Sequence, residues 1–350
     1  MTTPWTPPTV EPVADAALAA RLRHRIDHLT KPLGALGRIE SLMLQVGLLQ
    51  GRVDPQLHEP QAVVFAADHG LAARGVSAYP AEVTAQMVDN FLAGGAAISV
   101  LARTQGLGLT VVDAGVRAGT RSARPGLVVR PVAPGTADAL DGPAMSAAQC
   151  AQALALGCEV VRGLPGNALV LGEMGIANTS AAALLVARLT GQPVAACTGR
   201  GTGLDDAGYA RKLVLLQKVA ARHADARAPL DALAAFGGFE IAALAGAMLQ
   251  AAHERRLIVI DGYIVTAALL VAHALRPAVL DACVFAHRSH ESGHQLALTH
   301  LHAQPLLSLG LRLGEGSGAA LAWPLVAAAV ALLNGMASFD EAGVSARSEG

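Results

Sequence analysis

The sequence predicts an α/β fold: a doubly wound, mainly parallel sheet in a Rossmann-like large domain, with a small helical domain formed from both termini. Short apolar runs alternate along the chain with long helical stretches. The runs lack polar alternation, which is typical of parallel strands that are buried on both faces. The two ends of the chain, in contrast, have only helical patterns. We therefore expect an α/β domain at 61–320 and a helical domain at 1–60 plus 321–350.

The expected elements follow in order along the chain. A helical pattern over 14–50 is interrupted at Pro32 and Gly34. The expected strands are 62–68, 108–115, 126–132, 168–175, 193–199, 256–262 and 278–286, and 306–313 is a further candidate. The expected helices are 81–102, 146–163, a helix from Asn178, 206–223 and 263–275. Ligands bind at the carboxyl edge of such sheets, so the turns that follow the strands are the candidate site.

Composition narrows the class of function. The chain has 350 residues, is 53% apolar and 15% charged, and carries a net charge of −1, so it has no basic surface for nucleic acid. Four scattered cysteines without a CxxC pair fit a reduced, cytoplasmic chain. The N-terminus lacks the pattern of a signal peptide. The longest apolar run, 319–333, contains Pro324 and falls short of the roughly 18–20 residues that span a membrane, so we expect no membrane partner.

Two acidic residues stand in unusual surroundings. Glu315 lies in "LRLGEGSGAA", where glycines allow positive φ angles and a close approach of a ligand to the main chain. Glu173 ends an expected buried strand in "GEMGIANTS". Acids at buried positions are usually paired or functional. Both are candidate catalytic residues, and Asn178 or Thr179 is suited to cap the helix that follows Glu173.

The stretch "TGRGTGLDDAG" places Gly201 and Gly203 between an expected strand and an expected helix. Exposed backbone N–H groups and a helix N-terminus can bind an anion there. A plain turn without a ligand is the alternative interpretation. Lys212, on the following helix, could contact a phosphate.

The segment "HRSHESGHQLALTHLH" contains HExxH between His290 and His294, the pattern of zinc hydrolases. The pattern works only on a helix, and Ser292 and Gly293 are poor interior helix residues. We therefore expect a loop with solvated or capping histidines, and no metal. "GEGSG" is too short a glycine motif to indicate a nicotinamide cofactor. "ADHG" fits a turn at the end of a strand better than an acid–base pair.

Taken together, the motifs carry a more specific resemblance. In this order the chain contains "KPLGALGRIE", "ADHG", "VSAYPAEVTAQMVDNFLAGGAAISVLAR", "VVDAGV", "GEMGIANTS", "GRGTGLDD", "GGFEIAALAGAML", "DGYIVTAA", "SHESGH", "LRLGEGSGAALAWPLV" and "MASFDEAGV". From about residue 30 to 345 it resembles the nicotinate-nucleotide:dimethylbenzimidazole phosphoribosyltransferases. The resemblance implies a homodimer that needs no cofactor and transfers the phosphoribosyl group of nicotinate mononucleotide to 5,6-dimethylbenzimidazole. The products would be nicotinate and α-ribazole 5′-phosphate, used in assembling the nucleotide loop of cobalamin.

The resemblance also implies roles for individual residues. Glu315 would be the catalytic base, and Glu173 a second acid in the same pocket. Lys212 would reach the phosphate from the other subunit of the dimer. The substrate-binding residues would be Ser77, Tyr79, Gln86, Gly175, Asn178, Thr179, Gly201, Gly203, Asp205, Lys212, Ser289, Leu313, Gly314 and Gly316.

Several positions depart from the family pattern. Ala177 stands where the family has Gly, Ser180 and Ser317 stand for Thr, His290 for Ala, Ser292 for Pro and Ala35 for Ser. The choice of base therefore stays open. The alternatives are a related phosphoribosyltransferase that acts on another azole or on a phenol, and a non-catalytic nucleotide-binding protein.

Overall fold

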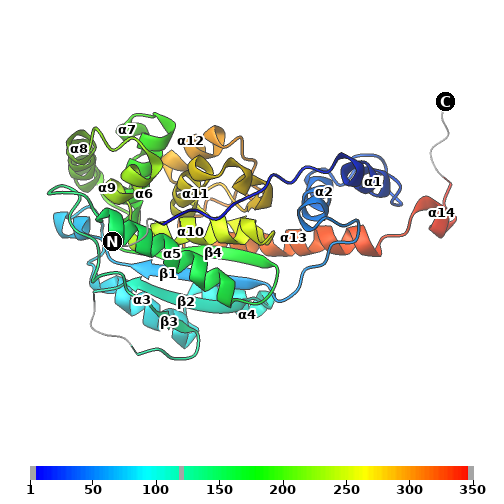
Figure 1. Ribbon diagram of the computed structural model, residues 1–350, viewed down its shortest axis with the longest axis horizontal. Helices are drawn as coiled ribbons and strands as arrows, with labels where there is room; N and C mark the ends of the chain where they lie inside the picture. Colours follow the sequence, from blue (N-terminus) through cyan, green and yellow to red (C-terminus); the bar gives the residue numbers. More distant parts are fainter. Residues whose placement is uncertain (1–4, 118–121, 346–350) are drawn as a thin grey trace.

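Six parallel strands form one sheet in the computed structural model, which describes residues 5–117 and 122–345 (Figure 1). The order across the sheet is β3-β2-β1-β4-β5-β6, the doubly wound order of two mononucleotide-binding halves. The predicted α/β class is therefore confirmed. The strands are β1 (Gln61–Ala67), β2 (Gly108–Gly115), β3 (Leu127–Val129), β4 (Ala168–Met174), β5 (Leu257–Ile260) and β6 (Cys283–Phe285).

The direction of winding reverses between β1 and β4. β1 pairs with β2 on one side and with β4 on the other, where Phe65 lies opposite Glu173. In folds of this kind ligands bind near such a reversal, outside the carboxyl ends of the strands. The sequence after β1 is Asp68-His69, and β4 ends at Glu173 and Met174.

The helices cover both faces of the sheet. All seven residues of β1 are buried, and alternate side chains of a strand face opposite sides. α10 packs against α5 and against four of the strands, while α3 and α13 also contact β4. The helices of this part are η1 (Gly70–Arg74), α3 (Glu82–Ala93), α4 (Ala97–Gln105), α5 (Ala147–Gly163), α6 (Asn178–Thr190), α7 (Val194–Cys197), α8 (Asp206–Arg222), α9 (Pro229–Phe236), α10 (Phe239–His253), α11 (Tyr263–Leu275), η2 (Pro277–Ala282) and α12 (Ser292–His300).

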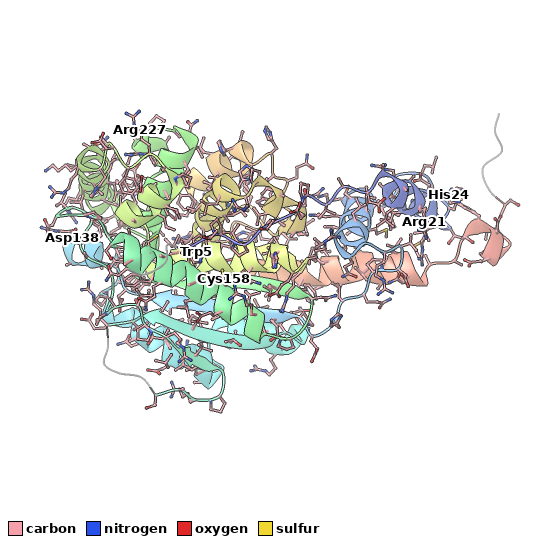
Figure 2. All side chains as sticks on the ribbon, viewed as in Figure 1. Trp5, Arg21, His24, Asp138, Cys158 and Arg227 are labelled. Carbon is pink, nitrogen blue, oxygen red and sulfur yellow. The ribbon has the colours of Figure 1, made fainter. Side chains whose placement is uncertain are left out.

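The terminal segments meet beside the sheet. α1 (Ala16–Asp27), α2 (Arg38–Gln50) and α14 (Phe339–Ala342) gather at the far end of α13 (Ser317–Gly335), on the right in Figure 1. A bridge between Leu29 and Ser338 joins the two ends of the chain. The segment before α1 instead follows the α/β part: Trp5 lies beside it in Figure 2, far from Arg21 and His24 on α1. The division into domains stays a prediction, and its residues 1–4 and 346–350 lie outside the described part.

Four predicted elements differ from the structure. The expected strand at 193–199 is the short helix α7, because an apolar run of this length fits either element. The expected helix over 81–102 is two helices that a left-handed Gly94 separates. Most of the expected strand 278–286 is η2, and only Cys283–Phe285 pairs with β5. The candidate strand 306–313 has only an isolated bridge, at Leu307.

Two helical stretches of the described residues, Glu82–Gln105 and Ser317–Gly335, are long and apolar enough to cross a membrane by length and composition alone. The expectation that the C-terminal apolar run is too short was therefore wrong. The unbroken apolar run has 15 residues, whereas Ser317 and Gly318 at the start and Asn334 and Gly335 at the end extend α13 to 19 residues. Half of the most apolar window of α13 is buried inside the fold.

Candidate active site

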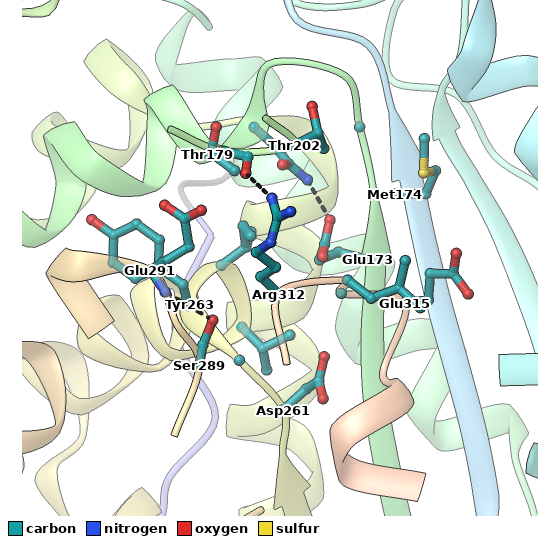
Figure 3. Close-up of a pocket in the computed structure, with 18 of the residues that line it drawn as sticks. Glu173, Met174, Thr179, Thr202, Asp261, Tyr263, Ser289, Glu291, Arg312 and Glu315 are labelled. Carbon is teal, nitrogen blue, oxygen red and sulfur yellow. Dashed lines mark hydrogen bonds between the residues drawn. The ribbon is translucent and has the colours of Figure 1, made fainter. Parts of the chain in front are cut away.

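A cavity of about 680 Å³ opens at the carboxyl ends of β4, β5 and β6. Its walls come from α3, the turn after β4, the 201–202 turn, the start of α11 and the loop before α13. Apolar side chains supply most of the lining, and a few polar groups converge inside it (Figure 3). Such a cavity suits a flat organic ligand with one charged end. The apolar lining is formed by Val83, Met87, Met174, Ile176, Ile264, Val265, Leu311 and Leu313.

Glu173 lies at the end of β4, 5% exposed, as the sequence predicted for this acid. Burial raises the pKa of Glu173 to about 8, the Asn178 amide opposes this, and the charges of Glu240, Asp261 and Glu315 add to it. Asn178 donates a hydrogen bond from Nδ2 to Glu173 Oε2. At neutral pH Glu173 is therefore mainly a neutral carboxylic acid, which can donate a hydrogen bond.

We expect Glu173→Gln to stabilise the protein at alkaline pH. The pKa of Glu173 rises from 4.5 to about 8 on folding, so the folded state holds more protons across that range. The free energy of unfolding therefore falls as pH rises from 4.5 to 8. Glutamine does not titrate, and the variant should gain about 1–3 kcal/mol at pH 8.5 and nothing at pH 4. Urea unfolding at both pH values measures this, and an equal effect at both would contradict it.

Glu315 belongs to a loop whose backbone lies directly on β4. Gly314, Glu315 and Gly316 all have positive φ angles, of 85°, 66° and 84°. A Cβ at Gly172 would collide with the Glu315 carbonyl, so only glycine at this position of β4 permits the approach. Glu315 Oε2 accepts a hydrogen bond from the Ile98 N–H, 3.4 Å away at the start of α4.

The environment of Glu315 differs from that of Glu173. Burial raises the pKa of Glu315, the Ile98 N–H opposes this, and Asp261 adds to it. In Figure 3 the two carboxylates point in different directions, with Glu173 beside Arg312 and Glu315 facing away from it. Two acids of one cavity thus have separate surroundings, which is how enzymes assign different roles to two carboxyl groups.

Asp261 anchors the loop that carries Glu315. It follows β5, and its carboxylate accepts hydrogen bonds from the N–H groups of Gly316, at 3.2 Å, and Ala319, at 2.9 Å. An acid at a helix N-terminus also interacts favourably with the helix dipole. His287 Nε2 lies 3.4 Å from Asp261 Oδ1. The position of Glu315 therefore depends on Asp261, a residue that the sequence analysis did not single out.

The turn after β4 differs from the predicted cap. The residue that precedes α6 is Ala177, at a φ of 79° and without a side-chain cap. Asn178 and Thr179 are the first residues of α6, and neither caps it. Their side chains serve other groups: Asn178 contacts Glu173, and Thr179 Oγ1 accepts a hydrogen bond of 3.0 Å from Lys212.

Lys212 is a buried cation on α8, 1% exposed. Burial lowers its pKa to about 8, and the charge of Glu291 opposes this. No carboxylate of the described residues lies within ion-pair distance of it. Its Nζ donates a hydrogen bond to Thr179 in the turn after β4. It lies next to Gly201, a residue with a φ of 57° in the glycine-rich turn.

Ten of the predicted site residues line the cavity, and six do not. Ser77 accepts a hydrogen bond from the Tyr79 N–H, Gln86 points to solvent while Val83 and Met87 on the same helix face the cavity, and Asp205 caps α8. Lys212 and Gly316 are buried outside the lining, and Gly203 is exposed in its turn. The lining includes Tyr79, Glu173, Gly175, Asn178, Thr179, Gly201, Ser289, Leu313, Gly314 and Glu315.

The histidine-rich segment was expected to be a loop, but from Ser292 onward it forms the helix α12. Ser292 and Gly293 form the first turn of α12, where helix propensity matters least, and the first His of HExxH lies before the helix. His287 and His294 are buried, although solvated histidines were predicted. His294 Nδ1 accepts a hydrogen bond from the Ser289 N–H. Among residues 5–117 and 122–345 no group of three or more possible metal ligands is found.

The acid and the histidine of the "ADHG" motif do not pair with each other. His69 Nε2 lies 2.6 Å from Glu240 Oε1, and Asp68 instead accepts a hydrogen bond from the Arg117 N–H. Glu240 is fully buried on α10, next to Gly175 of the cavity wall. The sequence could not indicate this pair, because 171 residues separate its two members.

Comparison with known proteins agrees over nearly the whole chain. A sequence model described as "Phosphoribosyltransferase" matches residues 11–344. The nicotinate-nucleotide–dimethylbenzimidazole phosphoribosyltransferase of Variovorax paradoxus is 65% identical over 97% of both chains. That of Cupriavidus necator is 59% identical over 97% of this chain and 99% of its own.

The solved structures agree as well. CobT from Thermus thermophilus superposes with a TM-score of 0.91 at 45% identity, covering 95% of this chain and 100% of its own. At this identity and coverage the agreement extends well beyond the fold. The chain belongs to the family of nicotinate-nucleotide–dimethylbenzimidazole phosphoribosyltransferases.

Proposed function

We propose that this protein transfers the 5-phosphoribosyl group of nicotinate mononucleotide to 5,6-dimethylbenzimidazole, giving α-ribazole 5′-phosphate and nicotinate. The reaction supplies the nucleotide loop of cobalamin. The relatives that are named for this reaction, and that match nearly the whole chain, support the proposal. The observation that carries it is one cavity with an apolar wall, two acids of different surroundings and a glycine turn beside a buried lysine.

Glu315 is the base in this proposal. Nicotinate leaves from a pyridinium and needs no proton, while the ribosyl carbon develops positive charge as in glycosidic cleavage. One nitrogen of the benzimidazole attacks, and the other carries an N–H. Glu315 takes that proton, which keeps the attacking nitrogen nucleophilic and avoids a cationic product. The raised pKa of Glu315 makes its carboxylate a better base than a solvated one.

Glu173 has the complementary role. With a pKa of about 8 it is mostly protonated at neutral pH, and so it is a hydrogen-bond donor rather than a second base. Asn178 fixes its other oxygen. We assign Glu173 to orienting a substrate from the end of β4, and this separates the two acids by environment.

The two substrates would occupy different walls. The apolar wall, which includes Val83, Met87 and Tyr79, suits the flat benzimidazole. The phosphate suits the turn at Gly201, Thr179 and Lys212, where backbone N–H groups, a hydroxyl and a buried cation converge. Ser289 and Gly175 would contact the nucleotide between them.

A direct assay tests the proposal. Purified protein is mixed with nicotinate mononucleotide and 5,6-dimethylbenzimidazole without added metal, and chromatography follows nicotinate and α-ribazole 5′-phosphate. Formation of both in equal amounts is expected. Nicotinate alone would indicate a nucleosidase, and no product would direct the assay to other azoles and phenols and then to a binding protein.

We further propose that the protein acts as a homodimer in the cytoplasm. The family resemblance and the four buried free cysteines support this. Sedimentation of the purified chain with and without nicotinate mononucleotide would measure its oligomeric state.

A further inference from the structure

Glu291 lies at the edge of the glycine turn, and the proposed reaction does not use it. It precedes α12 and lines the cavity, with no side-chain cap to the helix. Its carboxylate packs against Gly199 so closely that a Cβ there would collide with Oε2. Oε2 itself is buried and has no hydrogen-bond partner among the described residues. A buried carboxylate oxygen without a partner is costly unless a ligand or a proton completes it.

The groups around Glu291 are those that suit an anion. Lys212 on α8 and Arg312 in the loop before α13 are the cations that act on it. His290 of its own segment and Tyr263 of α11 complete the titratable groups that face it. None of the described cations lies within ion-pair distance of Glu291. The carboxylate thus faces the two cations across a gap.

The gap coincides with the phosphate position of the proposed function. Thr179 Oγ1 lies 3.1 Å, and Lys212 Nζ 3.6 Å, from a Cβ built on Gly201, so both side chains border this turn. Arg312 Nη1 donates to the Gly201 carbonyl at 3.4 Å. Figure 3 shows Glu291, Thr179 and Arg312 around the same part of the cavity. A phosphate that reaches Lys212 there also meets the Glu291 carboxylate.

We infer that Glu291 contacts the bound phosphate as a neutral carboxylic acid, so that binding of the dianion takes up one proton from solvent at this residue. The inference rests on the proposed function, which puts a phosphate in this turn. Two anions in contact would repel, whereas a protonated carboxyl group donates a hydrogen bond to a phosphate oxygen. Burial raises the pKa of Glu291, and Lys212, Arg312 and a hydrogen bond from the Gly201 N–H oppose this. A phosphate dianion in contact would raise it further.

The test is calorimetric titration of the intact protein, with sulfate as a tetrahedral dianion that does not titrate in this range, and then with nicotinate mononucleotide. Wild type, Glu291→Gln and the exposed control Glu159→Gln are compared from pH 5.5 to 8. Titrations in two buffers of different ionisation enthalpy count the protons taken up. Because the charge of Glu291 raises the pKa of Lys212, Lys212→Met and the double variant Lys212→Met/Glu291→Gln are measured as well, and the difference between these two isolates Glu291.

We expect wild type and Glu159→Gln to take up more protons than Glu291→Gln, by up to about one per sulfate. The affinity of wild type should fall faster as pH rises, and Glu291→Gln should bind about 5–50-fold more tightly at pH 8 and equally at pH 5.5. Parallel pH curves, equal proton counts, weaker binding by Glu291→Gln at every pH, or no sulfate binding by wild type would each overturn the inference. The proton count on wild type needs no variant to fold. Sulfate binding without turnover of nicotinate mononucleotide would count against the proposed reaction alone.

Discussion

Glu315→Gln is expected to lower kcat by about 10²–10⁴, because loss of a positioned general base has an effect of that size. Glutamine keeps the length of the side chain and can still accept the hydrogen bond from Ile98 N–H. The amide cannot take the azole proton. The affinity for nicotinate mononucleotide should change little, since the phosphate position lies on the other side of the cavity. Single-turnover rates and calorimetric binding of the nucleotide measure the two effects separately.

The matched control for this variant is Glu82→Gln, an exposed acid in the first turn of α3. It should turn over at the wild-type rate. If Glu315→Gln did so as well, Glu315 would not be the base. If the variant lost nucleotide binding instead of kcat, Glu315 would be holding the nucleotide or the loop before α13 rather than moving a proton.

The sequence predicted much of the fold because its strands have strong local patterns. The expected and observed bounds coincide at 108–115 and at 263–275. The prediction failed at 193–199, where a short apolar run carries no periodicity that separates strand from helix. It failed again at 278–286, because only pairing with β5 decides where β6 begins.

The site shows the same division between local and long-range information. Glu173 and Glu315 could be singled out because glycines and buried strands surround them in the sequence. Asp261 could not, because its role is to hold backbone N–H groups that lie 55 and 58 residues further along the chain. Gln86 was expected beside a substrate, but the helical phase of α3 turns Val83 and Met87 to the cavity instead.

The surroundings of Lys212 could likewise be learned only from the structure. Its position on α8 indicated a phosphate ligand, and in the fold its Nζ bonds Thr179 of the same chain. The reach across to another subunit stays a prediction. A buried lysine without a carboxylate partner destabilises a protein, so its presence here points to a ligand that supplies the missing charge.

Lys212→Met is therefore expected to stabilise the free protein and to weaken substrate binding. The pKa of Lys212 falls from 10.5 to about 8 on folding, so the unfolded chain holds more protons between these values and stability rises with pH across them. Methionine removes the cost of the buried charge, and the gain of about 1–3 kcal/mol should be largest below pH 8 and vanish above pH 10.5. Loss of a charge-assisted hydrogen bond to phosphate should raise the Kd of nicotinate mononucleotide about 10–150-fold.

Urea unfolding at pH 7 and at pH 10.5, together with calorimetric titration of the nucleotide, measures both effects. Lys218→Met is the matched control, because Lys218 lies on the same helix and is exposed. It should leave stability and affinity unchanged. A variant at position 212 that is less stable at pH 7 would show that the ammonium group supports the fold through Thr179. A more stable variant with unchanged affinity would remove Lys212 from the phosphate site and leave the backbone of the glycine turn to bind the anion.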